Sequence, residues 1–168
     1  MKPVGTNETV RELEAVTHQS FWQRLKETQV SEIMSGLLVV LFAYTVITKL
    51  SDIEYFKYQL YNQVFSAQVS KALVYLLPLS EIIATALLCI SKLRFYGLLV
   101  SILLMGAFTA YTIFIVAGAF DKVPCVCGGV ISNMSWPVHL VFNCVFFIIA
   151  IIGLRFYLKE RRPKKSEG

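Results

Sequence analysis

The sequence has too few charged and polar residues for a soluble domain of its size. Charged residues make up only 16% of its 168 residues, while 56% are hydrophobic, and its mean hydropathy is +0.62. A single domain of this length cannot enclose so much apolar surface in its own core, so part of that surface must face lipid. The composition therefore excludes an ordinary soluble domain and predicts a membrane protein.

The sequence also lacks a recognisable signal peptide and internal repeats. The first 30 residues contain no apolar stretch that ends in a small-residue cleavage site, so we expect an uncleaved first span that directs insertion. No repeat is present, and the basic tail is the only compositionally biased run. One membrane domain is therefore expected.

Four apolar stretches are long enough to cross a membrane, because a bilayer core of about 30 Å needs about 20 apolar residues per helix. The predicted fold class is all-α, a polytopic membrane four-helix transmembrane bundle with short interfacial helices. The second and third spans must be antiparallel neighbours, since their connection is very short. The predicted domains are a cytoplasmic N-terminal segment (1–30), the membrane domain (31–158) and a basic cytoplasmic tail (159–168). The predicted spans are Ile33–Leu50, Ala72–Ile90, Phe95–Gly118 and Trp136–Tyr157.

Two segments outside the spans space their apolar residues as helices do. In Arg11–Lys26 the spacing is imperfect, so we expect either a helix lying against the headgroups or a helical lead-in to the first span. In Ser51–Ser70, Phe56, Leu60 and Val64 follow an i, i+4, i+8 pattern. This second pattern predicts a short amphipathic helix that covers the outer end of the bundle.

The basic residues predict the orientation of the bundle. All but four of the 16 lysines and arginines fall in the N-terminal segment, the second loop and the tail. By the positive-inside rule both termini are then cytoplasmic, and the first and third loops face outward from a bacterial inner membrane. The same distribution argues against a nucleic-acid partner, despite the net charge of +5, and makes the lipid bilayer the expected partner.

A pair of cysteines, Cys125 and Cys127, lies in the outward-facing third loop. In an oxidising compartment such thiols are expected to oxidise, either to each other or to a partner's thiol. A bridge across one residue closes a tight ring, and strained exposed disulfides tend to be the reactive ones. Pro124 before the pair and Gly128-Gly129 after it would allow another backbone to approach the sulfurs.

Other interpretations of the cysteines remain open. The pair could be an inert disulfide or two unpaired thiols. A metal site that used both thiolates and His139 would leave a tetrahedral ion short of ligands, so no metal is predicted. Cys89 and Cys144 fall within spans and are expected to be packing residues.

Glu81 is the only acidic residue well inside a predicted span, and an intramembrane carboxyl group is a functional candidate because it is costly to bury. In the fourth span Trp136, His139 and Asn143 follow an i, i+3, i+7 pattern, so they share one face, which should look inward. Tyr111 lies in the outer half of the third span and could join them through its hydroxyl.

Two roles are open for these polar residues. Glu81, His139 and Asn143 could bond one another and hold the helices together. Alternatively they form a proton-handling or quinone-headgroup site beneath the cysteine loop, because thiol oxidation releases protons and histidine titrates near neutral pH. Lys49, at the outer end of the first span, is expected to extend to the headgroups, with an ion pair to Glu81 as the alternative.

Several motifs together resemble the MauE/DoxX-like family of four-span membrane proteins, over about Ser31 to Leu158. The resemblance implies redox and thiol chemistry outside the cytoplasm, since MauE is needed for maturation of methylamine dehydrogenase and DoxX-type proteins are linked to sulfur-compound oxidation and thioredoxin-like partners. It also implies that Cys125 and Cys127 match the family's cysteine motif. The polar positions of the family would be Glu81, Trp136, His139 and Asn143. The motifs are PCVCGG, SWPVHLVFN, LFAYTVITKL, LPLSEIIA and GAFTAYT.

The leading hypothesis is a membrane-embedded thiol–disulfide redox protein or accessory that exchanges electrons with an extracytoplasmic thioredoxin-like partner, with a quinone as the candidate cofactor. Cys125 and Cys127 would exchange disulfides, while Glu81 and His139 would handle protons. The alternative is a non-enzymatic membrane assembly or maturation factor, so the sequence leaves open whether the protein is an enzyme. A permease is less favoured, because one carboxylate and one histidine are few polar groups to line a route for a solute across the membrane. Residues expected to shape the pocket or permit docking are Trp136, Asn143, Tyr111, Gly128 and Gly129.

Overall fold

The structure is a computed structural model that describes residues 6–119 and 135–161, with side chains described in 29–119 and 135–161. These residues form helices and turns and contain no strand. Four of the helices are long and apolar enough to cross a membrane, which confirms the predicted all-α, four-span fold. The elements are α1 (Thr6–Ser51), α2 (Ile53–Tyr61), α3 (Ala67–Cys89), α4 (Arg94–Val116) and α5 (Trp136–Arg161).

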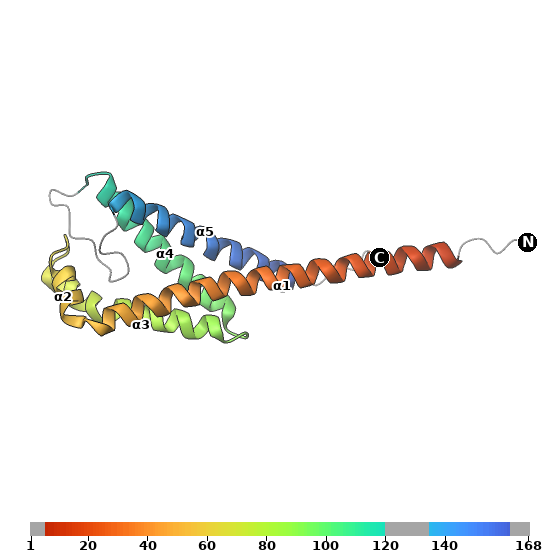
Figure 1. The fold of residues 1–168 in the computed structure, drawn as a ribbon, viewed down its shortest axis with the longest axis horizontal. Coiled ribbons are helices and arrows are strands. Elements are labelled where there is room, and N and C mark those ends of the chain that lie inside the picture. Colours follow the sequence, from red (N-terminus) through yellow and green to blue (C-terminus); the bar gives the residue numbers. More distant parts are fainter. Residues whose placement is uncertain (1–5, 120–134, 162–168) are drawn as a thin grey trace, which may run out of the picture.

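Helix α1 is much longer than the span it contains. It runs without a break from Thr6 to Ser51, and its first part extends beyond the other helices (Figure 1). The segment has no proline and a single glycine, Gly36, so nothing in the backbone ends the helix early. Of the two expectations for Arg11–Lys26, the structure contains the helical lead-in.

Helix α2 confirms the short amphipathic helix predicted within residues 51–70, but it ends at Tyr61, so Val64 of the predicted pattern lies beyond it and is exposed. The side chain of Asp52 caps its start by accepting a hydrogen bond from the backbone N–H of Tyr55 at 3.0 Å. Phe56 and Leu60 are buried with Val74 of α3 in a small apolar cluster. Three tyrosines on the helix are exposed, as suits a membrane interface: Tyr55, Tyr58 and Tyr61.

The helices pack tightly at one end of the bundle and separate at the other. Helix α4 packs along α5, and α1 contacts both α3 and α5. Toward the end of α5, Gly153 lets α1 approach closely, since a Cβ added at Gly153 would lie 3.2 Å from the Cβ of Met34. From this contact α1 and α5 diverge toward the end where α2 lies (Figure 1). The space between them is the location of the site described below.

A glycine also sets the distance between α3 and α4. A Cβ added at Gly97 would lie 2.7 Å from the backbone nitrogen of Leu88, which is closer than real Cβ contacts allow. The two helices follow each other through a short turn, closed by a hydrogen bond from Leu93 N–H to the carbonyl of Ile90 at 2.9 Å. They are the antiparallel neighbours that the short connection predicted. Close approach over small residues is how membrane helices gain contact where no hydrophobic force drives them together.

We expect Gly97→Ala to destabilise the bundle by about 1 to 3 kcal/mol, because the added methyl group would force the α3 backbone away. Thermal unfolding in detergent measures the change. Gly36→Ala is the matched control: a Cβ at this exposed helical position meets no atom within 4 Å, and alanine favours helix over glycine. A Gly97→Ala protein as stable as Gly36→Ala would show that this contact does not limit the packing.

Candidate functional site

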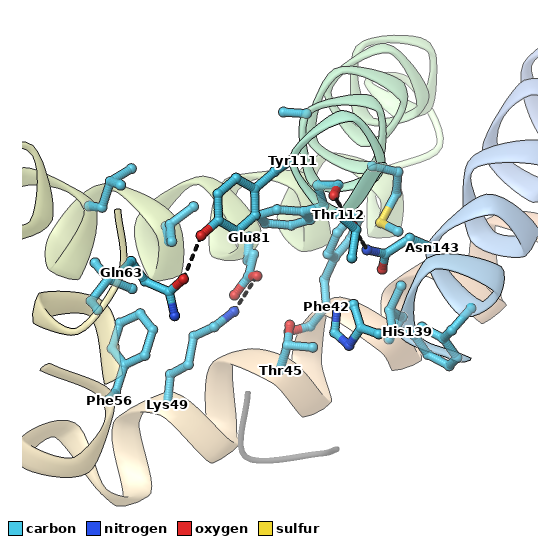
Figure 2. Close-up of a pocket in the computed structure, with 18 of the residues that line it drawn as sticks. Phe42, Thr45, Lys49, Phe56, Gln63, Glu81, Tyr111, Thr112, His139 and Asn143 are labelled. Carbon is cyan, nitrogen blue, oxygen red and sulfur yellow. Dashed lines mark hydrogen bonds and ion pairs between the residues drawn. The ribbon is translucent and has the colours of Figure 1, made fainter. Parts of the chain in front are cut away.

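A cavity of about 570 Å³ lies where the helices separate, and all five helices contribute to its lining. Figure 2 shows side chains from α1, α3, α4 and α5 turned toward this common space. Most of the lining is apolar, which is typical of sites for small organic molecules. The polar lining residues are Thr45, Thr48, Lys49, Gln63, Glu81, Tyr111, Thr112, Trp136, His139 and Asn143.

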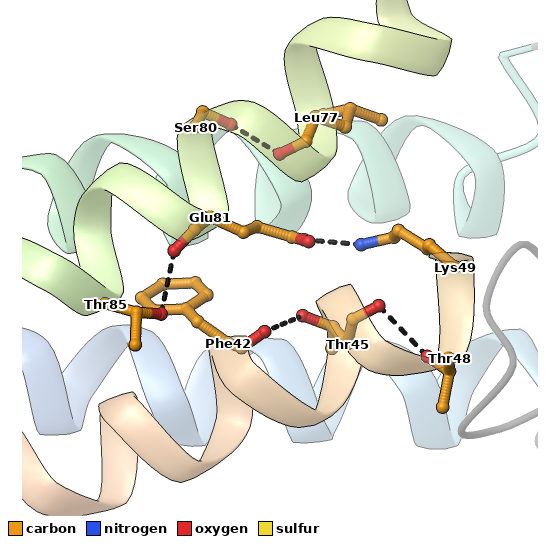
Figure 3. A network of polar contacts seen from close by, with 8 residues as sticks. All are labelled: Phe42, Thr45, Thr48, Lys49, Leu77, Ser80, Glu81 and Thr85. Carbon is orange, nitrogen blue, oxygen red and sulfur yellow. Dashed lines mark hydrogen bonds and ion pairs between the residues drawn. The ribbon is translucent and has the colours of Figure 1, made fainter. Parts of the chain in front are cut away.

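The deepest charged group in the cavity is Glu81 of α3, which is 1% exposed. Lys49, in the last turn of α1, donates a hydrogen bond to its Oε1 at 2.5 Å, and the lysine side chain is 11% exposed (Figure 3). A buried carboxylate is stable only when it is paired or protonated. The ion pair supplies the pairing and joins α1 to α3.

The expectation that Lys49 extends to the headgroups is wrong. The physical reason is that α2 covers this end of α1, with the Phe56 ring centroid 5.9 Å from the lysine nitrogen. The buried carboxylate on the neighbouring helix then stabilises the ammonium group more than the headgroups would, because the path to the headgroups is partly blocked. Lys49 pairs with Glu81 instead.

One oxygen of the Glu81 carboxylate is left unpaired. Oε2 is buried and has no hydrogen-bond partner among the described residues. Neighbouring threonine hydroxyls bond to their own helices, as Figure 3 shows: Thr45 donates to the carbonyl of Phe42 at 3.0 Å and Thr85 to the carbonyl of Glu81 at 2.8 Å. Oε2 therefore has no partner in the described part of the chain, on a residue that lines the cavity.

On the opposite wall, α5 contributes Trp136, His139 and Asn143, which share the cavity face that their spacing predicted. The rings of Trp136 and His139 meet edge to face, with centroids 6.2 Å apart and planes inclined at 61°. The Nδ1 atom of His139 is buried and also has no partner in the described part of the chain. The imidazole is thus held by a ring contact and leaves a nitrogen free.

Asn143 is used to join helices. Its side-chain amide donates to the hydroxyl of Thr112 on α4 at 2.9 Å, and Thr112 in turn donates to the carbonyl of Phe108. Of the two roles left open, direct bonding among Glu81, His139 and Asn143 is not what the structure shows, although Glu81 and Asn143 each join two helices through other partners. Each has a different environment within the same cavity.

Tyr111 lines the cavity through a contact that sequence reasoning missed. Its hydroxyl donates to the side-chain oxygen of Gln63 at 2.5 Å, and its ring stacks on Phe65 with a centroid distance of 5.3 Å. Gln63 and Phe65 lie between α2 and α3, so this contact fixes the α2–α3 connection against α4. Nothing in the sequence marks Gln63, because its partner is 48 residues away.

The remaining predicted site residues are Cys125, Cys127, Gly128 and Gly129, which lie outside the described residues. Phe114 and Trp136, on the helices before and after this segment, both line the cavity. The cysteine segment is therefore attached to the bundle at the end that contains the cavity.

The other two cysteines are free. Cys89 is exposed at the end of α3, so the expectation that it packs in the bundle is wrong, and Cys144 is half-buried on α5. No group of three histidine, cysteine, aspartate or glutamate residues in 29–119 and 135–161 is placed to hold a metal ion.

Residues 27–156 match the model of a protein family described as methylamine utilisation protein MauE. No curated protein and no solved structure matched the chain. The matched range covers well over half of the sequence and includes every polar residue of the cavity, as well as Cys125 and Cys127.

We expect Lys49→Met to lower the free energy of unfolding by about 3 to 5 kcal/mol, because it leaves Glu81 buried without a counterion. The double variant Lys49→Met, Glu81→Leu should recover most of this loss, since both charges are removed. Thermal unfolding in detergent measures both changes.

Lys57→Met is the control, because Lys57 pairs with Glu54 at 2.7 Å on the exposed face of α2 and exposed pairs contribute little. Its stability should match that of the unsubstituted protein. If Lys49→Met were equally harmless, the buried ion pair would not stabilise the fold.

Proposed function

The chain belongs to the MauE family of methylamine utilisation proteins, and from this premise we propose that it is a membrane-embedded thiol–disulfide redox protein or accessory. It acts in the bacterial cytoplasmic membrane with both termini in the cytoplasm. Cys125 and Cys127 exchange disulfides with an extracytoplasmic thioredoxin-like protein. A quinone dissolved in the membrane is the second redox partner.

One observation supports this proposal: a buried carboxylate and a half-buried imidazole, each with an atom that has no partner among the described residues, line a cavity at the end of the bundle where the cysteine segment attaches. In a bundle selected only for stability, such groups would have all their hydrogen bonds formed or would be replaced by apolar residues. Thiol redox chemistry uses proton-handling groups of this kind.

The proposed chemistry balances in both directions. A thiolate attacks a disulfide sulfur, a mixed disulfide forms, and the second thiol resolves it, so one protein gains the disulfide that the other loses. When the Cys125–Cys127 dithiol becomes a disulfide at the expense of a quinone, two electrons and two protons pass to the quinone and a quinol forms. Glu81 and His139 exchange protons with this second step.

The description of the family favours a second candidate function. A methylamine utilisation protein could serve as a non-enzymatic membrane factor that holds an extracytoplasmic partner during its assembly or maturation. In that case the cysteines would be bridged without exchanging, and variants lacking them would still bind the partner.

We expect Cys125→Ser or Cys127→Ser, in a background with Cys89→Ser and Cys144→Ser, to accumulate a mixed disulfide with a thioredoxin-like protein. A single remaining thiol can form the mixed disulfide, whereas the thiol that would resolve it is absent. Non-reducing gels followed by mass spectrometry identify the adduct. The variant without any of the four cysteines is the matched control and should form none.

Two outcomes distinguish the candidate functions. If no adduct forms and the redox state of extracytoplasmic thiols is unchanged without Cys125 and Cys127, the redox proposal is wrong. If the cysteine-free variant also supports methylamine-dependent growth as well as the original protein, the assembly function is favoured.

A further inference from the structure

Two polar atoms in the cavity have no partner in the described residues, and their chemistry limits what can bind between them. Glu81 Oε2 belongs to a carboxyl group that Lys49 holds through the other oxygen, so it is an acceptor while the group is ionised. His139 Nδ1 can donate or accept, depending on which ring nitrogen carries the proton. A ligand that meets both atoms needs two oxygen or nitrogen atoms, of which one can donate in at least one of its states.

The rest of the cavity restricts the ligand to a mainly apolar molecule. Most of its lining is apolar and includes Phe42, Phe108 and Phe142. Since Lys49 already neutralises Glu81, the paired charges offer no net charge to bind an ion. The matching ligand is a neutral ring with two oxygens: as a quinone it accepts a hydrogen bond from His139, and as a quinol it can also donate one to Glu81.

The lining also has an edge that faces outward from the bundle. Ala107 and Phe114 of α4 line the cavity and are exposed at the same time, and Phe114 is 56% exposed. Leu73 and Leu77 on the adjacent α3 line it and are partly exposed. Because both helices are membrane spans, this edge faces lipid, and the small side chain of Ala107 leaves room beside it.

We propose that a quinone ring binds in the cavity between Glu81 and His139, and that its hydrocarbon tail leaves the bundle into the lipid between α3 and α4, over Ala107. The inference deepens the proposed function and rests on it for the choice of a redox-active ligand. Entry from the lipid suits a tailed molecule that is too apolar to dissolve in water. Ala107 then determines access, and the imidazole of His139 holds one ring oxygen.

Tryptophan fluorescence can test this binding, because the chain has only two tryptophans and Trp136 lines the cavity. Trp22 lies outside the family match, so Trp22→Phe leaves Trp136 as the single reporter. The full chain in lipid nanodiscs is titrated with a benzoquinone that bears a ten-carbon tail. We expect saturable quenching, in contrast to the linear quenching that partition into lipid alone would give.

Two substitutions in the Trp22→Phe background locate the site. Ala107→Phe fills the edge between α3 and α4 and should weaken quinone binding by about tenfold or more. Ala110→Phe is its matched control, since Ala110 is exposed on the same helix and does not line the cavity, and it should bind as the parent does. His139→Phe keeps an aromatic ring beside Trp136 but loses the nitrogen, and should weaken binding roughly fivefold.

Linear quenching in the parent, or equal affinities for Ala107→Phe and Ala110→Phe, would overturn the proposed site. Circular dichroism and thermal unfolding of each variant separate loss of binding from loss of fold. The mixed-disulfide experiment gives a result that does not depend on the quinone titration. Adduct without saturable quenching would overturn the quinone site and leave thiol exchange intact, whereas saturable quenching without adduct would support the site and remove the thiol role.

Discussion

The ion pair between Lys49 and Glu81 is the interaction on which the arrangement of the site depends. A carboxylate on a membrane helix needs a counterion, and Lys49, turned inward from the neighbouring α1, supplies it at 2.5 Å. That requirement holds the C-terminal end of α1 against α3. It also favours the position of α2, because the Lys49 nitrogen lies 5.9 Å from the centroid of the Phe56 ring. The pair therefore fixes three helices at the end where the bundle is most open.

The openness itself follows from where the small residues are. Gly97 and Gly153 allow backbone-close contacts of α4 with α3 and of α5 with α1, so the helices converge there. At the other end the contacts are made by long polar side chains such as Tyr111, which reaches Gln63. Side-chain contacts of this length hold helices in place without closing the space between them. A cavity lies at this end, and the polar side chains that make these contacts are part of its wall.

Much of the fold could be predicted from local sequence, because hydrophobic length and helical spacing are local properties. The four spans, helix α2 and the common face of Trp136, His139 and Asn143 all follow from spacing within one helix. Pairing between helices could not be predicted in the same way: Lys49 meets Glu81 across 32 residues, and which polar groups pair depends on helix rotation and on what α2 covers. Whether Arg11–Lys26 continues the first span could not be predicted for a related reason, since its charged residues are compatible with both a lead-in helix and an interfacial one.

The pairing has a consequence for proton transfer that the isolated residues would not have. With one oxygen bound to Lys49, the Glu81 carboxylate is neutralised while its other oxygen has no partner among the described residues, so an uncharged ligand can enter without meeting an unpaired charge. If that oxygen then takes a proton, the lysine is left as an uncompensated cation in a low-dielectric cavity, which is costly. The protonated state is therefore short-lived unless negative charge arrives with it. Electrons added to a quinone beside Glu81 would bring that charge, so the same ion pair that stabilises the fold would couple proton uptake to reduction.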